Sequence, residues 1–184
     1  MAFWIGSRIS LSSTILAITL MLAKTAYACN DDQDCILQVR QCESLLQSTN
    51  PNYGIACYER MSRDGIGIAA FNLGVLYSDG TIVPIDQKQS EYYFLIAANL
   101  EFEGAAFNLG NVICQNNFFD RKAECVHWMQ VAGENGDPAG YHNLALYLAN
   151  FDVDIEGAVA NFQLAAKMGF EPSIEVLESL GIAY

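Results

Sequence analysis

The sequence predicts an all-α protein, an α-solenoid in which helix-turn-helix units stack in an array. Nearly the same phrase occurs three times along the chain, as AAFNLGVLY, AAFNLGNVI and GYHNLALYL. The leucines at the same place in each phrase, Leu73, Leu109 and Leu144, are 36 and 35 residues apart. Such a period is too long for one helix and too short for a domain, so each copy should be half of a stacked helix pair. No stretch alternates apolar and polar residues as a half-buried strand would.

The first residues have the layout of a secretory signal peptide. Arg8 precedes an apolar run over Ile9–Leu22, and a small-residue site follows, which predicts cleavage after Ala28 and a periplasmic or secreted protein. The run is shorter than the ~18 apolar residues of a membrane span, which argues against a membrane anchor. Because cleavage removes this run, we expect no membrane insertion of the mature protein. A lipoprotein acylated at Cys29 is the alternative, although the residues before this cysteine depart from the usual lipidation signal.

Residues 29–184 should form one acidic domain. The signal peptide contains Arg8 and Lys24, so 7 of the 9 basic residues remain beside 21 acidic ones, and the net charge becomes −14. This charge disfavours nucleic acid and anionic membrane surfaces, and it favours a basic protein or peptide by steering the encounter. Solubility in an exported protein explains the same charge equally well.

The second helix of each unit should begin at an acidic residue and end at a glycine. Asp86, Asp120 and Asp154 recur at spacings of 34 and 34, and a carboxylate at a helix start accepts hydrogen bonds from unpaired amides. Gly136 and Gly169 end two of these helices, because glycine tolerates the left-handed backbone of a helix stop. The resulting divisions are an N-terminal cap with a partial repeat over 29–66, repeats over 67–103, 104–137 and 138–170, and a C-terminal cap over 171–184.

Each second helix also places a larger residue four positions before an alanine, so that the two share a face. We expect the small residue to let neighbouring helices approach and the larger side chain to fill the gap beside it. The pairs are Tyr93 with Ala97, Trp128 with Ala132, and Asn161 with Ala165.

The C-terminal cap is less regular than the repeats. Either Leu177 continues the pattern eight residues after Gly169, or LGIAY from Leu180 mirrors LGVLY from Leu73. We expect a capping helix over Ser173–Ile182, because the last unit of an array has one face without a neighbour.

All six cysteines lie beyond the signal peptide, which indicates disulfides in an exported chain. One cysteine near the end of a predicted helix and another near the start of the next should meet across an antiparallel hairpin. This argument gives Cys114–Cys125. Cys35 and Cys42 are seven residues apart on one helix face and lie over the same neighbour, which makes Cys42–Cys57 the second predicted pair and leaves Cys29 with Cys35.

A zinc site is the alternative for Cys114 and Cys125, together with His127 and His142. The sequence has no CxxC or HxxxH spacing, and thiolates do not persist in an oxidising compartment. We therefore expect no metal and no cofactor.

The repeated pattern A-x-x-L-G-x-x-Y, then D-x-x-x-K, then an aromatic residue and A-A closing on glycine, resembles the Sel-1-like repeat family, relatives of the tetratricopeptide repeats. The resemblance runs from about Cys57 to the C-terminus, and it departs where Ile113 replaces a tyrosine and Ala145 replaces a glycine. The best unit carries the match at Ala70, Leu73, Gly74, Tyr77, Gly80, Asp86, Lys88, Tyr93, Ala97 and Ala98.

This resemblance implies a right-handed α-solenoid whose concave wall, lined by the first helices, binds other proteins, and it implies no catalysis. Cysteine-rich exported members have been linked with penicillin binding and β-lactam hydrolysis. The predicted mature chain has no Ser-x-x-Lys, and helical spacing places no nucleophile beside a base, so we expect no catalytic residues.

Two rows of residues are candidates for partner contact. Asn72, Asn108 and Asn143 precede the repeated leucines, where asparagine is a poor helix former, and they would make a ladder of amides on the concave wall. A hydrogen bond from each asparagine to the backbone of the adjacent unit is the structural alternative. The second row is aromatic and either fills gaps between helices or anchors a partner: Phe71, Phe107, Tyr141 and His142.

The sequence thus predicts an exported protein-interaction module, specifically an immunity protein that neutralises a basic toxin. Glu101 and Glu103 in the turn between units would form an acidic edge that steers such a partner, and so would Asp152, Asp154 and Glu156. Solvated loop charge is the alternative explanation of both edges. The alternatives are an envelope adaptor that stabilises a machine such as a flagellar motor or secretion system, and a β-lactam-binding or hydrolysing protein.

Overall fold

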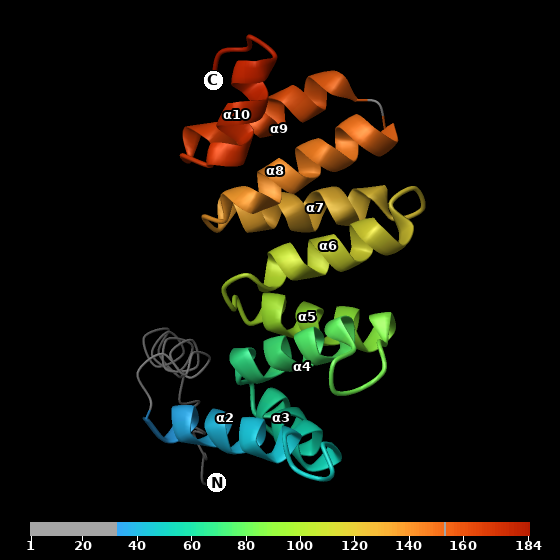
Figure 1. The fold of residues 1–184 in the computed structure, drawn as a ribbon, viewed down its shortest axis with the longest axis vertical. Coiled ribbons are helices and arrows are strands. Elements are labelled where there is room, and N and C mark those ends of the chain that lie inside the picture. Colours follow the sequence, from blue (N-terminus) through green and yellow to red (C-terminus); the bar gives the residue numbers. More distant parts are fainter. Residues whose placement is uncertain (1–32, 153) are drawn as a thin grey trace, which may run out of the picture.

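The computed structural model describes residues 33–152 and 154–184. These residues form nine α-helices and one π-helical turn, η1, and contain no strand (Figure 1). The helices are α2 (Gln33–Leu46), α3 (Asn52–Arg63), α4 (Gly67–Asp79), α5 (Gln87–Asn99), α6 (Ala105–Asn117), α7 (Lys122–Glu134), α8 (Pro138–Tyr147), α9 (Ile155–Lys167) and α10 (Glu171–Ser179), with η1 at Leu148–Asp152 between α8 and α9.

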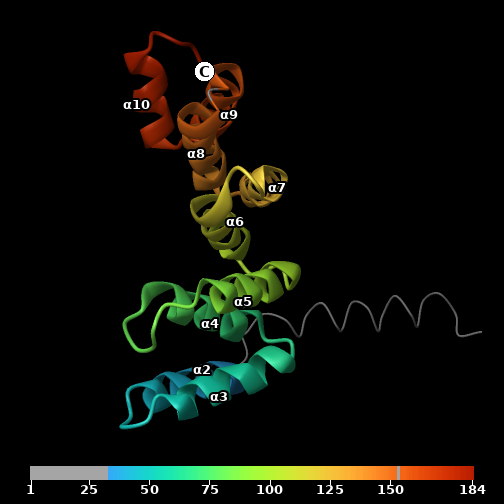
Figure 2. The ribbon, with the colours of Figure 1, turned by 90° about the vertical axis from the view of Figure 1, so that its right-hand side faces the viewer.

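The helices stack in the order of the sequence, as the repeat period predicts. Turns within a unit, α6–α7 and α8–α9, lie at one edge of the array, and turns between units, α5–α6 and α7–α8, lie at the other (Figure 1). First helices α6 and α8 lie on one side and second helices α7 and α9 on the other, with α10 on the side of the first helices (Figure 2). The α-solenoid prediction is confirmed. Among the described residues, no helix is both long and apolar enough to cross a membrane.

The repeated leucines form the spine of the core. Leu73, Leu109 and Leu144 are fully buried, and so is Leu177. Leu180, by contrast, is 60% exposed. The step from Gly169 to Leu177 therefore sets the C-terminal register, and α10 ends at Ser179, three residues before the predicted Ile182.

In α7 and α9 the large core residue lies one position after the one that the sequence suggests. Met129 and Phe162 are buried, whereas Trp128 and Asn161 are only partly buried. In α5 both Tyr93 and Phe94 are buried, together with Ala97.

The close approach of the two helices in the first repeat depends on a glycine, which has no side chain. A Cβ added to Gly74 would lie 2.6 Å from the ring of Phe94, so only glycine lets α4 and α5 approach this closely. The buried Ser90 hydroxyl also donates to the Gly74 carbonyl at 2.9 Å. In the second repeat the equivalent Gly110 faces flexible Met129, where an added Cβ would lie 3.2 Å from the side chain.

Two of the three predicted helix starts are confirmed. Asp86 accepts hydrogen bonds from the amides of Lys88 and Gln89, and Asp154 accepts one from Gly157. The prediction for Asp120 is wrong, because α7 begins one residue later and Arg121 makes no side-chain cap.

Arg121 instead joins two repeats. Its guanidinium donates to both carboxylate oxygens of Glu91 on α5 at 2.7 Å, and it also bonds Glu124 on α7. These bonds raise the pKa of the Arg121 side chain and lower the pKa of the Glu124 carboxyl. A bidentate pair of this kind fixes orientation as well as distance.

Between the two main hydrophobic cores of the array, the fully buried side chains are small. One core cluster belongs to α2–α5, and a second belongs to α6–α10 together with Phe94 from α5. Between them lies a small cluster built on Ala70, Ala97 and Ala105. Phe94 is therefore the large buried side chain through which the second core extends from α6 to α5.

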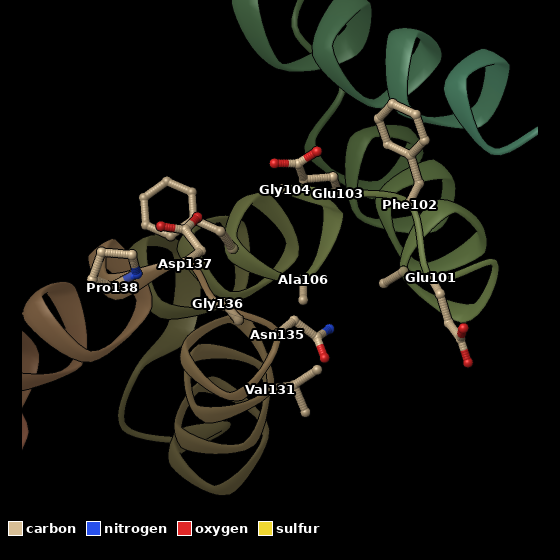
Figure 3. Close-up of a pocket in the computed structure, with 13 residues that line it drawn as sticks. Glu101, Phe102, Glu103, Gly104, Ala106, Val131, Asn135, Gly136, Asp137 and Pro138 are labelled. Carbon is tan, nitrogen blue, oxygen red and sulfur yellow. The ribbon is translucent and has the colours of Figure 1, made fainter. Parts of the chain in front are cut away.

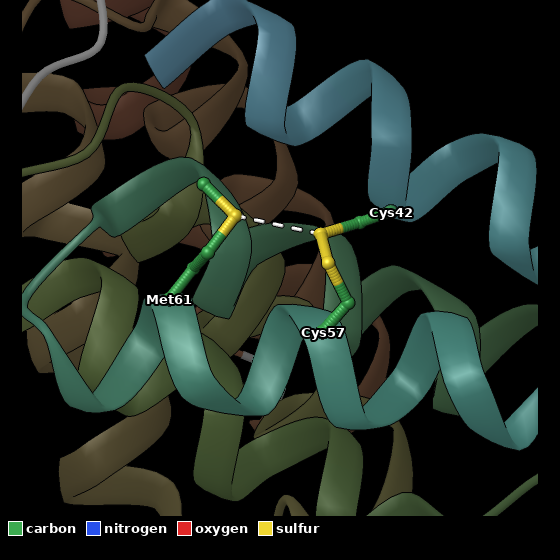
Figure 4. Close-up of a disulfide and its surroundings, with 3 residues drawn as sticks. All are labelled: Cys42, Cys57 and Met61. Atoms are coloured by element: carbon green, nitrogen blue, oxygen red, sulfur yellow. Dashed lines mark hydrogen bonds between the residues drawn. A yellow bond between two sulfur atoms is a disulfide. The ribbon is translucent and has the colours of Figure 1, made fainter. Parts of the chain in front are cut away.

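Each disulfide ties the two helices of one hairpin. Cys42 bonds Cys57 between α2 and α3, and Cys114 bonds Cys125 between α6 and α7, so the first two predicted pairs are confirmed. The Cys42 sulfur also contacts the Met61 sulfur at 3.5 Å (Figure 4). The third predicted pair contains Cys29, which lies outside the described residues, as do the predicted signal peptide and its predicted cleavage site.

Candidate functional site

The three predicted asparagines have partners inside the array. Asn143 Nδ2 donates to Oδ1 of Asn111 in the preceding unit at 3.1 Å. Asn108 Nδ2 donates to the Gly104 carbonyl one helical turn back, at 2.9 Å.

Asn72 is hydrogen-bonded to the phenol of Tyr58, which is buried on α3. Burial raises the pKa of Tyr58 to about 12, and the bond to Asn72 partly opposes this rise. Asn72 therefore joins α4 to α3 and Asn143 joins α8 to α6, whereas the Asn108 bond stays within the first turn of α6.

Three predicted aromatic residues are partly buried between helices. Phe71 packs edge-on against Phe94, with ring centroids 5.6 Å apart, and against Phe102 at 5.0 Å. Tyr141 lies against Gly133 of α7. Phe107 packs against the C-terminal core and also lines the groove described below.

His142 is paired with a serine that lies 31 residues away. Its Nδ1 is 2.8 Å from the hydroxyl of Ser173, and its ring packs between Phe162 and Phe170. Such a pair has the chemistry of a nucleophile and a base, and helical spacing alone could not reveal it. Ser173 is fully buried, however, so no substrate reaches its hydroxyl and the pair joins α8 to α10 as a structural contact.

Stability should fall in mild acid because of this histidine. Burial lowers the pKa of His142 below its ordinary value of 6.5, so the unfolded chain binds the proton more readily than the folded one. The loss should begin as the pH drops through 6.5 and stop below the lowered folded-state pKa. Urea unfolding at a series of pH values measures it. A His142→Gln variant, which keeps a hydrogen-bonding group at this place, should lose that part of the pH dependence, and an unchanged profile would contradict the assignment.

A groove of about 840 Å³ opens between the two inter-repeat turns. Its walls come from the end of α5, the start of α6, the end of α7 and the start of α8 (Figure 3). Apolar side chains and three carboxylates line it together, among them Phe102, Phe107, Val131, Glu101, Glu103 and Asp137. Asp137 also caps α8 by accepting a hydrogen bond from the amide of Ala139 at 3.0 Å.

Glu101 holds an unfavourable backbone conformation in this groove. The second helices α3, α7 and α9 are each followed by a glycine with positive φ, at Gly65, Gly136 and Gly169. After α5 the same place is taken by Glu101, with φ of 55°. A non-glycine residue in the left-handed region costs roughly 1–2 kcal/mol of conformational free energy, so Glu101 lowers the stability of this turn.

The position of Glu101 could have been found in the sequence. Gly65 and Gly136 stand eight residues before Leu73 and Leu144, and Glu101 stands eight residues before Leu109. The missing glycine is thus the signal for a special turn.

The described residues contain no group of three or more metal-ligating side chains placed to hold an ion. Cys114 and Cys125 bond each other, so neither offers a thiolate to zinc.

Stacked helical hairpins with a groove between their turns define the class of protein as a repeat solenoid. The family model of the Sel1 repeat matches residues 67–102, 120–137 and 138–170. The chain is a Sel1 repeat protein, and proteins of this fold are protein-interaction modules. The unmatched stretch contains α6, where Ile113 departs from the repeat pattern.

Solved structures share this fold at low sequence identity. The c5321 protective antigen of uropathogenic Escherichia coli, described as having an SLR fold, aligns with a TM-score of 0.64 at 21% identity, over 80% of this chain and 34% of that one. A Sel1 repeat protein from Oxalobacter formigenes aligns with a TM-score of 0.59 at 24% identity, over 74% and 59%.

A third similar structure is the immunity protein Pa5087 from Pseudomonas aeruginosa, with a TM-score of 0.51 at 18% identity, over 85% of this chain and 61% of that one. The present chain thus spans from about a third to three fifths of these proteins. No curated protein matched the sequence.

Proposed function

We propose that this protein binds a basic protein in the groove between its inter-repeat turns and neutralises it, as an immunity protein neutralises a toxin. The observation that carries the proposal is the left-handed Glu101, whose carboxylate lines the groove with those of Glu103 and Asp137. A residue that lowers stability at one place of a regular repeat is expected to serve a second purpose there.

The composition of the groove supports a protein as the partner. Phe102 and Phe107 supply apolar area, and acidic groups at the rim attract and orient a basic surface. The chain as a whole carries 21 acidic and 9 basic residues, which adds long-range attraction. The structural likeness to an immunity protein and the disulfides, which suit an extracytoplasmic place, agree with this role.

Glu101→Gly should raise stability and weaken binding at the same time. Glycine relieves the left-handed strain and should add about 1 kcal/mol to the free energy of unfolding. Loss of the rim carboxylate should weaken partner capture roughly three- to tenfold. Urea unfolding measures the first effect, and quantitative capture from the envelope extract of the producing cells measures the second.

Two control variants separate charge from backbone conformation. Glu101→Gln removes the charge and keeps the strain, so it should weaken capture without adding stability. Glu175→Gln, at an exposed position on α10 away from the groove, should change neither quantity. If Glu101→Gly captures the same protein as well as the wild type does, the groove is not the binding site.

The neutralising role has its own test. The captured protein should inhibit growth when exported alone, and the inhibition should disappear when this chain is exported with it. A captured protein that has no effect on growth would overturn the immunity role and leave the binding result standing.

A further inference from the structure

Four aromatic side chains meet at the edge of the array opposite the groove. They come from the α6–α7 turn and from the end of α8 with η1, which lie at the same edge (Figure 1). We call this surface the aromatic edge, and its residues are Phe118, Phe119, Tyr147 and Phe151.

Two members of the aromatic edge form a base and two are presented to solvent. Phe118 is buried and stacks on Tyr147, with ring centroids 5.9 Å apart. Phe119 is 74% exposed and Phe151 is 48% exposed. Their ring planes meet at 89° with centroids 6.2 Å apart, so together they make a corner that offers aromatic faces in two directions.

The surroundings of the aromatic edge are acidic. Among the described side chains of residues 118–124 and 147–156, four are acidic and two are basic, a net charge of −2. Asp120 follows Phe119 directly, and Asp154 starts α9 beside η1; both are exposed. The nearby Arg121 is already bonded to Glu91 and Glu124, which neutralises its charge.

Charge selects the occupant of this surface. A second copy of the chain would bring the same carboxylates against these, and an anionic lipid surface would be repelled for the same reason. A cation is attracted both by the carboxylates and by the faces of the aromatic rings. Arginine suits the corner better than lysine, because its planar guanidinium stacks on a ring while donating hydrogen bonds to an acid.

We propose that the aromatic edge is a second docking surface, which takes an arginine side chain of a basic protein between Phe119, Phe151 and the neighbouring carboxylates. The inference rests on the proposed function in taking a basic protein as the partner. The site itself is distinct, because the length of α6 separates the aromatic edge from the groove.

A pair of synthetic peptides tests this chemistry directly. The probes are a blocked peptide of Gly-Arg repeats and its Gly-Lys counterpart, titrated into the full chain carrying 13C-labelled phenylalanine rings. The arginine peptide should shift the ring signals of Phe119 and Phe151 and bind about threefold more tightly than the lysine peptide. Equal affinity for the two peptides would overturn the proposal, and so would ring signals of Phe119 and Phe151 that do not shift on addition of the arginine peptide.

Variants distinguish this surface from the groove. Phe119→Ser should weaken binding of the arginine peptide about threefold, and because Phe119 is so exposed the melting temperature should stay within a few degrees of the wild type. Phe151→Ser provides a second variant if the first unfolds. Glu101→Gly should leave the peptide-induced shifts of the Phe119 ring unchanged. A result that rules out binding in the groove therefore does not rule out binding at the aromatic edge.

Self-association is the remaining occupant to test. Analytical ultracentrifugation of the wild type should show one species of the monomer mass. A dimer that Phe119→Ser dissociates would assign the aromatic edge to a second copy of the chain and overturn the proposal.

Discussion

Replacing Phe94 by alanine should lower the free energy of unfolding by about 3–5 kcal/mol, the range for removing a buried aromatic ring. Phe94 is 1% exposed, and its ring lies directly over Gly74. Without the ring, the space left by the glycine on α4 becomes part of a cavity that rigid helices cannot close. Urea unfolding followed by far-UV circular dichroism measures the loss.

The position of Phe94 in the array explains why this effect should be large. It is the one large buried side chain of α5 that belongs to the cluster of α6–α10, and the fully buried residues of the neighbouring small cluster are alanines, with Phe71, Ile96 and Phe102 partly buried against them. Tyr92→Ala is the matched control, since Tyr92 lies two residues away on the same helix and is 56% exposed. That change should cost about 1 kcal/mol or less. Equal losses in the two variants would show that the boundary between the two cores does not depend on Phe94.

Removing the Cys114–Cys125 disulfide should lower the free energy of unfolding by about 3 kcal/mol, by the chain-entropy relation for a short loop. The bond closes a loop with a sequence separation of 11 and lies within the C-terminal core. The double variant Cys114→Ala with Cys125→Ala tests this. Because neighbouring repeats contribute stability locally in a solenoid, hydrogen exchange should accelerate most in α6 and α7.

The other disulfide supplies the control for this local effect. In Cys42→Ala with Cys57→Ala, the accelerated exchange should appear in α2 and α3, since this bond ties those two helices with a separation of 15. If both hairpins lose protection from hydrogen exchange equally in both variants, the disulfides do not act locally. The array would then unfold as one cooperative unit.

Part of the candidate site could be predicted from the sequence. The acidic turn at Glu101 and Glu103 follows from the repeat boundary, and Phe107 follows from its place before Asn108. Bonds within the array were the structural alternative to the amide ladder, but the sequence could not identify the partners, because Tyr58 and Asn111 reach Asn72 and Asn143 only across packed helices.

The aromatic edge shows a different limit. Phe118 and Phe119 read as the end of one helix, and Phe151 lies in a segment that the sequence marks only as acidic. Their rings meet because η1 follows α8 directly and faces the α6–α7 turn across the edge of the array. A contact between side chains that far apart depends on how two repeats are rotated against each other.

Periodicity by itself determined the number and order of the helices, the buried leucines and the two hairpins that the disulfides join. Those features depend on contacts within one unit or with the next, and a repeated spacing encodes such contacts directly. Only the tertiary structure decided that Phe94 rather than Tyr93 fills the space over Gly74 and that Arg121 bridges α5 and α7. These depend on the exact rotation and separation of neighbouring helices, which small differences in side-chain volume set and a spacing pattern does not record.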